Sequence, residues 1–240
     1  MGTSSLDELN WLNRFVTETP GDDEVGGKPR QVPNACWSRV HPSAVPEPNL
    51  RLWSDEMAQE LNLEMGNGEV LGGNRIAVGM DPYAQRYGGH QFGNWAGQLG
   101  DGRAINFGEI VNQKGRKWSL QLKGAGPTPY SRTADGLAVL RSSIREFLCS
   151  EWMHYLGVPT TRALSIVTTG EEVLRDIFYD GNPQFEKGAI VARLSESFIR
   201  FGNFELLAAR GELETLRKLL IYCINEDPEL SDVSETATQK

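Results

Sequence analysis

A lysine beside a glycine-containing segment is suited to holding the phosphates of a nucleotide. Lys123 ends the run Trp118–Lys123, in which apolar and polar side chains alternate as in a β-strand with one buried face. Gly124, Ala125 and Gly126 follow directly. A strand holds the lysine stem along the sheet, so that the ammonium group reaches an anion at the strand end. The alternative is a solvated lysine at a strand edge.

Glu146 is the candidate partner for Lys123. It lies 23 residues further along, off the apolar face of a predicted helix and near the small residues Ser142 and Ser143. Small side chains let a helix approach a sheet closely, and a carboxylate placed there needs a cationic partner. Protein kinases hold their phosphate-binding lysine with such a helix glutamate. The alternative is a solvated glutamate paired along its own helix.

The segment before the predicted strand 104–111 is a candidate anion-binding loop. Successive glycines, Gly100 and Gly102 among them, let backbone N–H groups crowd an anion, and Arg103 adds a forked donor. The segment matches neither GxGxxG nor GxxxxGK[ST], so a tight structural turn explains it equally well.

Two arginines and one acidic residue complete the candidate site. Arg193 and Arg200, seven residues apart, flank a predicted passage from strand to helix and could clamp a polyphosphate. Arginines in such places more often form surface ion pairs that contribute little. Asp135 and Gly136 open a long predicted helix, and a helix cap explains them equally well.

The elements that must position these residues follow an α+β pattern. Alternation of apolar and polar residues predicts strands at 104–111 and 118–123, joined by a turn at 112–117, and further strands at 160–168 and 188–194. Apolar residues at helical spacing predict helices over Leu6–Phe15, Ser54–Leu61 with Ser54 as N-cap, about Asp135–Tyr155, and Asn203–Ile224.

Composition excludes several classes of protein. The 240 residues carry a net charge of −8, which disfavours non-specific binding to nucleic acid or anionic membranes. No stretch approaches the roughly 20 apolar residues of a membrane helix, and no secretory or transit signal is seen. Three scattered cysteines indicate free thiols in a reducing compartment, without a zinc site. We expect a soluble intracellular protein, cytoplasmic in a bacterium and mitochondrial or plastid in a eukaryote.

Long runs of the sequence resemble the selenoprotein O family. They are PRQVPNACWSRVHP (29–42), YGGHQFGNWAGQLGDGRA (87–104), LQLKGAGPTPYSRTADG (120–136), LRSSIREFLCSE (140–151), LGVPTTRAL (156–164) and ARLSESFIRFGNFE (192–205). The resemblance implies a protein-kinase-like fold (a pseudokinase), with an N-terminal nucleotide-binding lobe of antiparallel sheet and helix and the start of a helical C-terminal lobe. It also implies a protein adenylyltransferase that binds inverted ATP and transfers AMP to Ser, Thr or Tyr hydroxyls of proteins.

Carried onto this sequence, the resemblance implies that Lys123 and Glu146 are the catalytic ion pair. The nucleotide contacts that it implies are Gly100, Gly102, Arg103, Lys123, Asp135, Gly136, Arg193 and Arg200. The family's catalytic Asp and Asn and its metal-binding Asp lie in a C-terminal lobe beyond the matched region. The ligands of the expected Mg²⁺ or Mn²⁺ are therefore predicted outside this chain.

The predicted domain organisation has four parts. They are an N-terminal extension (1–50), a kinase-like nucleotide-binding lobe (51–203), the start of a helical lobe (204–225) and a disordered polar tail (226–240). Two functions stay open, a truncated adenylyltransferase and a non-catalytic nucleotide-binding or interaction module. An ordinary protein kinase ranks behind both, because the GxGxxG motif of protein kinases is absent.

Overall fold

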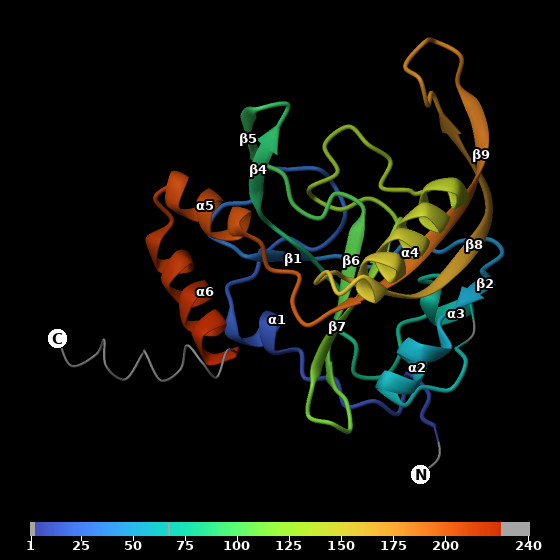
Figure 1. Cartoon of the computed structure of the whole chain (residues 1–240). Helices are drawn as coiled ribbons and strands as arrows, with labels where there is room; N and C mark the ends of the chain where they lie inside the picture. The colour runs from blue at the N-terminus through green and yellow to red at the C-terminus, as the bar shows by residue number, and fades with distance from the viewer. Residues whose placement is uncertain (1–2, 67, 227–240) are drawn as a thin grey trace.

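A computed structural model describes residues 3–66 and 68–226, and these form an α+β structure as the sequence predicts (Figure 1). The described helices are α1 (Arg14–Glu18), α2 (Asp55–Leu61), α3 (Gly68–Leu71), α4 (Leu140–Tyr155), α5 (Phe201–Ala209) and α6 (Leu213–Glu226). The described strands are β1 (Trp37–Arg39), β2 (Asn49–Trp53), β3 (Tyr83–Gln85), β4 (Gly88–Gln91), β5 (Asn94–Gln98), β6 (Ala104–Val111), β7 (Lys117–Lys123), β8 (Arg162–Arg175) and β9 (Gln184–Ser195).

Seven strands form one antiparallel sheet in the order β1-β3-β6-β7-β9-β8-β2, while β4 and β5 form a separate hairpin. The predicted strands at 104–111, 118–123, 160–168 and 188–194 are confirmed as parts of β6, β7, β8 and β9. In the register, Lys123 lies opposite Ala104 of β6 on one side and Val191 of β9 on the other. The sheet therefore places the end of β7 beside the start of β6.

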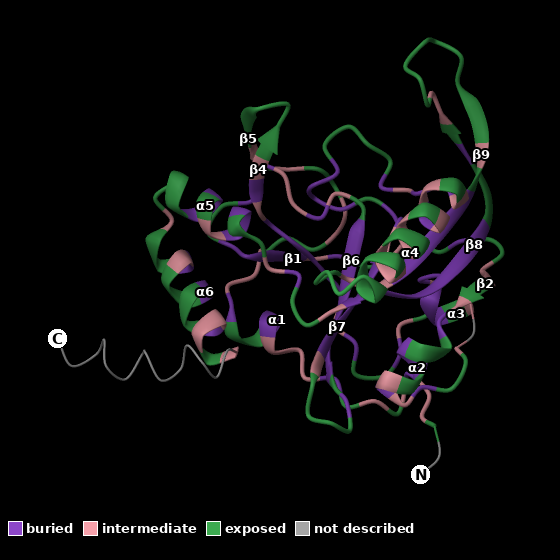
Figure 2. Cartoon of the chain, viewed as in Figure 1, coloured by how far each residue is buried: buried purple, intermediate pink, exposed green. Residues whose placement is uncertain are grey.

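The two faces of β7 have different environments. Trp118, Leu120 and Leu122 belong to the large apolar core on one face, which α2 and α3 also cover. Burying a leucine side chain of this kind stabilises the fold by about 1.5–3 kcal/mol. On the opposite face α4 packs against β8 and β9 through Leu140 and Ile144. Figure 2 shows buried residues along the central strands and exposed residues at the outer ends of β8 and β9.

The predicted helix Leu6–Phe15 is wrong, because the N-terminal segment pairs with the sheet. Trp11 forms a bridge with Ile110 of β6, and the backbone N–H of Leu12 donates to the carbonyl of Glu109 at 2.8 Å. Backbone groups used in this way are not free for a helix ladder. The helix begins only at Arg14.

The predicted helix at about Asp135–Tyr155 begins later, at Leu140. Gly136 has a φ of +75°, which ends any helical path from Asp135. Val139, the residue before α4, is extended and forms a bridge with Gly188 of β9. Residues 135–139 are thus held by the sheet and by a turn, so Asp135 is no cap of this helix.

The predicted helix Asn203–Ile224 is wrong as a single element. It divides into α5 and α6 at Gly211, which has a φ of +70° that glycine adopts readily. The helix Ser54–Leu61 is confirmed as α2, where the Ser54 hydroxyl accepts from the Met57 N–H at 3.3 Å. Among the described helices, none is long and apolar enough to cross a membrane.

The domain boundaries stay a prediction. β1 and the first residues of β2 come from the segment assigned to the N-terminal extension, and both strands belong to the large sheet. The predicted polar tail over 226–240 lies outside the described residues after Glu226.

Candidate functional site

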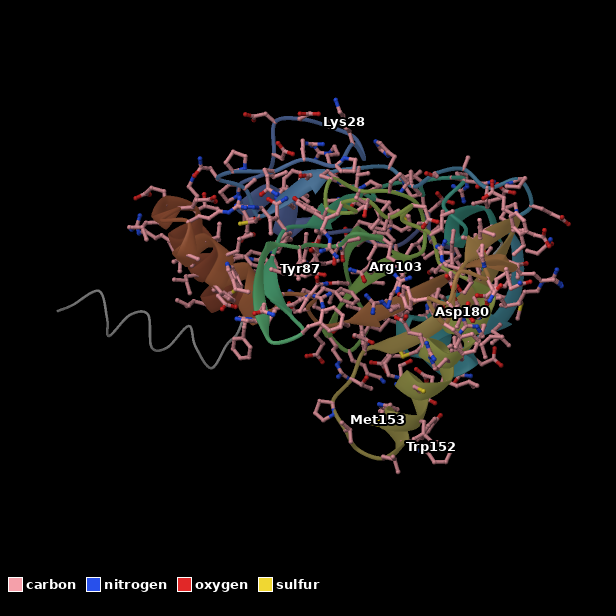
Figure 3. The ribbon with its side chains drawn as sticks, turned by 90° about the horizontal axis from the view of Figure 1, so that it is seen from above. Lys28, Tyr87, Arg103, Trp152, Met153 and Asp180 are labelled. Atoms are coloured by element: carbon pink, nitrogen blue, oxygen red, sulfur yellow. The ribbon has the colours of Figure 1, made fainter. Side chains whose placement is uncertain are left out.

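A cavity of about 780 Å³ opens between the segment 99–104, the end of β7, the loop 130–137 and the passage from β9 to α5. The predicted nucleotide contacts all line it: Gly100, Gly102, Arg103, Lys123, Asp135, Gly136, Arg193 and Arg200. Figure 3 shows Tyr87 and Arg103, two residues of its wall, near the middle of the molecule in a view from above. The structure therefore brings together residues that lie up to 100 positions apart in the sequence.

The Lys123–Glu146 ion pair is present. Lys123 Nζ donates to Glu146 Oε2 at 2.6 Å, from the end of β7 to the second turn of α4, and both side chains are about three-quarters buried. Burial lowers the pKa of the Lys123 ammonium, as does the charge of Arg193, and the Glu146 carboxylate opposes both effects. Lys123 is thus a fixed cation at the cavity wall and not a solvated lysine.

Glu146 holds a second cation of the site. Arg193 Nη1 donates to Glu146 Oε1 at 2.9 Å, and its Nη2 donates to Gln121 Oε1. The guanidinium also lies over the ring of Phe198, 5.4 Å from its centre. One carboxylate therefore orients two cations toward the cavity, which leaves this trio with a net positive charge.

Arg200 lies at the other side of the cavity. Its guanidinium is stacked over the Tyr87 ring at 4.5 Å, and Nη2 is 3.6 Å from Asp101 Oδ1. Its backbone N–H donates to Asn203 Oδ1 at 2.8 Å, at the start of α5. Arg193 and Arg200, which flank the passage 193–200, thus both line the cavity, while their role as a polyphosphate clamp stays a prediction.

The glycines of the segment 100–102 have a structural reason of their own. Gly100 has a φ of +100°, and a Cβ there would overlap the ring of Tyr130. A Cβ at Gly102 would meet the backbone of Tyr130 at 2.9 Å. The close approach of the loop 128–131 therefore requires both glycines, in agreement with a tight structural turn, while both still line the cavity.

Asp135 has an ion-pair partner that the sequence did not suggest. Arg175, at the end of β8, donates to both Asp135 carboxylate oxygens at 2.7 and 2.9 Å. Burial opposes the resulting shift, but the hydrogen bond from Arg175 lowers the pKa of Asp135. Gly136 follows in a left-handed turn, where a Cβ would overlap the backbone of Gly126. This pair ties the projecting β8–β9 hairpin to the rim of the cavity.

A buried polar chain beneath the cavity was also missed. The carboxylate of Asp101, 3% exposed, accepts from Asn106 Nδ2 at 3.0 Å, and Asn106 Oδ1 accepts from Gln121 Nε2 at 3.0 Å. Gln121 in turn accepts from Arg193. The signal in the sequence was the polar Asn106 and Gln121 within strands whose neighbours are apolar. This chain connects the two ends of the site through β6 and β7.

Asp101 carries a buried charge near Arg200. Burial raises the pKa of its carboxyl group, and the positive charge of Arg200 and the backbone N–H of Gln85 oppose the increase. The distance of 3.6 Å between Arg200 Nη2 and Asp101 Oδ1 is longer than a hydrogen bond, and the Arg200 side chain is half-exposed. Asp101 therefore holds Arg200 loosely. Arg200 is therefore free to approach an anion in the cavity.

The described residues offer no metal site. Across residues 3–66 and 68–226, no three His, Cys, Asp or Glu side chains come together as possible ligands. The divalent cation stays a prediction, with its ligands expected outside these residues.

Comparison with known proteins gives a consistent result. A model of the family described as protein adenylyltransferase SelO matches residues 28–237. Curated relatives are named protein nucleotidyltransferase YdiU. The relative from Azoarcus sp. is 64% identical over 221 residues, covering 90% of this chain and 43% of its own length. The relative from Methylobacillus flagellatus is 59% identical over 234 residues, covering 95% and 45%. The chain therefore spans less than half the length of these relatives.

Proposed function

The chain belongs to the SelO family of protein adenylyltransferases, and on that premise we propose that its cavity binds ATP as the nucleotide-binding part of such an enzyme. The observation that carries the proposal is the position of Lys123, fixed by Glu146 at 2.6 Å in the wall of a cavity lined by several arginines. A cavity of about 780 Å³ lies within the range of small-molecule sites. ATP supplies the negative charges that such a wall attracts.

The fold that we propose is the nucleotide-binding lobe of a protein kinase. An antiparallel sheet carries the lysine on β7, and α4 crosses the sheet with the glutamate (Figure 1). In protein kinases this pair holds the lysine against the phosphates. The α5–α6 segment is then the start of the helical lobe.

We further propose that ATP binds with its terminal phosphates inward. Lys123 and Arg193 are held at the inner wall, where they would neutralise the β- and γ-phosphates. The α-phosphorus would then face an acceptor hydroxyl of a protein Ser, Thr or Tyr. The hydroxyl oxygen bonds to the α-phosphorus as the bond to the pyrophosphate oxygen breaks, and the proton passes to a base expected in the C-terminal lobe.

A full-length chimera tests transfer directly. This chain would replace the aligned region of the Azoarcus relative and be incubated with Mg²⁺ or Mn²⁺ and a general protein acceptor. We expect label from ATP labelled at the α-phosphate to reach the acceptor, and Lys123→Ala to abolish it. The chain of residues 1–240 alone is expected to bind ATP without transfer, because its described part offers no cluster of metal ligands.

The other functions give different results in the same assay. A non-catalytic module would bind ATP, but its chimera would transfer nothing while the unmodified relative does. A protein kinase would transfer label only from the γ-phosphate. Transfer by the 1–240 chain alone would contradict our expectation that the metal ligands lie elsewhere.

The two arginines of the passage 193–200 predict a preference for ATP over AMP. Arg193→Ala and Arg200→Ala should each weaken ATP binding by about tenfold or more, the effect of losing one charge-assisted hydrogen bond. AMP binding should change little, because AMP lacks the terminal phosphates. Titration calorimetry of both nucleotides measures this, with Arg116→Ala, which removes an exposed pair to Glu196, as the control. Equal losses for ATP and AMP would mean that these arginines support the fold.

A further inference from the structure

A second, smaller cavity borders Lys123 as well. It measures about 340 Å³ and is lined by Arg103, Lys123, Ser142, Ser143, Arg145 and Glu146, among others. Its floor is the first part of α4, and Arg103 and Lys123 line both cavities. A group bound in the second cavity would therefore lie directly beside a ligand of the first.

The second cavity carries uncompensated positive charge. Glu146 carries one negative charge and can therefore neutralise one cation only. Its carboxylate is already bonded to both Lys123 and Arg193. Within the part of the chain that the structure describes, Arg103 and Arg145 have no ion-pair partner. Two unpaired guanidinium groups that border one small cavity favour an anion between them.

Ser143 provides an independent sign of a missing ligand. The residue is 1% exposed, and its Oγ has no hydrogen-bond partner among the described residues. A buried hydroxyl is normally hydrogen-bonded, so one without a partner in a cavity wall is available to donate a hydrogen bond to a bound group. The neighbouring Ser142 hydroxyl, in contrast, is bonded to the Val139 carbonyl at 2.9 Å.

We propose that the second cavity binds a phosphate group, with Arg103, Arg145 and the Ser143 hydroxyl as its donors. A phosphate presents several acceptor oxygens in a tetrahedral arrangement, which suits two guanidinium groups and a hydroxyl that approach from different elements. Its source is either the terminal phosphate of the bound nucleotide or free inorganic phosphate. The first source rests on the proposed function, whereas the second does not.

Three variants of the 1–240 chain test the site. Arg145→Ala removes one donor, Ser143→Ala removes the buried hydroxyl, and Arg141→Ala serves as control, because it is one turn away on α4 and pairs with Glu186 outside the cavity. The probes are ATP, AMP and inorganic phosphate, measured by titration calorimetry and by ³¹P NMR. Urea unfolding of each variant measures stability.

We expect Arg145→Ala and Ser143→Ala each to weaken binding of ATP or of inorganic phosphate by about tenfold, and Arg141→Ala to change neither. Ser143→Ala should fold at least as stably as the wild type, because it deletes a polar group that lacks a partner. Reduced stability of Ser143→Ala without any loss of binding would make the hydroxyl structural and overturn the proposal.

The probes separate the sources of the phosphate. If the variants lose affinity for ATP but not for AMP, the bound group is the terminal phosphate of the nucleotide. If they lose affinity for inorganic phosphate alone, the bound group is a free anion. Equal loss for ATP and AMP, or wild-type affinities in both variants, would overturn the site. Failure of the wild-type chain to bind ATP would overturn the proposed function, while the inorganic phosphate titration would still decide on this cavity.

Discussion

Replacing Lys123 by alanine is expected to weaken ATP binding by about tenfold to a hundredfold, the loss of one or more charge-assisted hydrogen bonds. The effect should exceed that of either arginine, because Lys123 lines both cavities. The variant also leaves Glu146 paired with Arg193 alone, so the net positive charge of the trio is lost. Titration calorimetry of ATP into the 1–240 chain measures the loss.

Glu146→Gln should weaken ATP binding less than Lys123→Ala does. The amide oxygen still accepts a hydrogen bond from Lys123, but it carries no charge to fix the ammonium group. The cation is therefore retained but is held less firmly in position. Lys114→Ala is the matched control, because Lys114 lies in the β6–β7 turn and pairs with Glu60 far from the cavity. An unchanged affinity in Lys123→Ala would remove the nucleotide-binding proposal.

The parts of the fold that the sequence predicted are those with strong local patterns. β6 and β7 were predicted from the alternation of residue types in the sequence, although the structure buries both faces of these strands. Gly115, with a φ of +77°, supplies the turn between them. α2 was predicted from Ser54, whose hydroxyl caps it. In these elements local preference and tertiary packing agree.

The errors arose where distant partners override local spacing. Residues 6–13 have helical spacing of leucines, yet Trp11 pairs with β6 instead. Residues 135–139 were read as helix, but Val139 pairs with β9 before α4 starts. No local pattern reveals a strand partner about 50 or 100 residues away, which is why both helix starts were wrong.

In the site, too, one contact was predicted from the sequence and another, between distant segments, was missed. Lys123 and Glu146 were predicted as a pair from the strand–loop–helix order and from the resemblance to the selenoprotein O family, and they meet at 2.6 Å. The pairing of Asp135 with Arg175 was missed, because it depends on how the β8–β9 hairpin turns back over the loop 130–137. The roles of these residues in nucleotide binding stay predictions.

A buried ion pair holds the α5–α6 segment to the sheet. Arg86, whose side chain is 0% exposed, donates to both carboxylate oxygens of Glu212 at 2.6 and 2.8 Å, and to the Ala35 carbonyl at 2.9 Å. Glu212 lies at the break between α5 and α6 and is 8% exposed. The Arg86 carbonyl also accepts from Asn203, the residue that bonds to the Arg200 N–H. One buried arginine thus supports both the segment and a cation of the site.

We therefore expect Arg86→Met to destabilise the chain by about 3–5 kcal/mol, because it leaves the buried Glu212 carboxylate with the Asn34 N–H as a donor but without its cation. Adding Glu212→Leu should recover much of this loss, since two apolar side chains bury no charge. Hydrogen bonding to Arg86 lowers the pKa of Glu212, although burial opposes this shift. The pair therefore stabilises the wild type above pH 4.5, and this stabilisation decreases as the pH falls below that value. In Arg86→Met the unpaired carboxylate favours protonation, and the stability difference from wild type should narrow toward acidic pH.

Urea unfolding at several pH values measures both effects, with the exposed Arg75→Ala as control. A double variant no more stable than Arg86→Met would mean that Arg86 acts through packing and its bond to Ala35, and not through the ion pair.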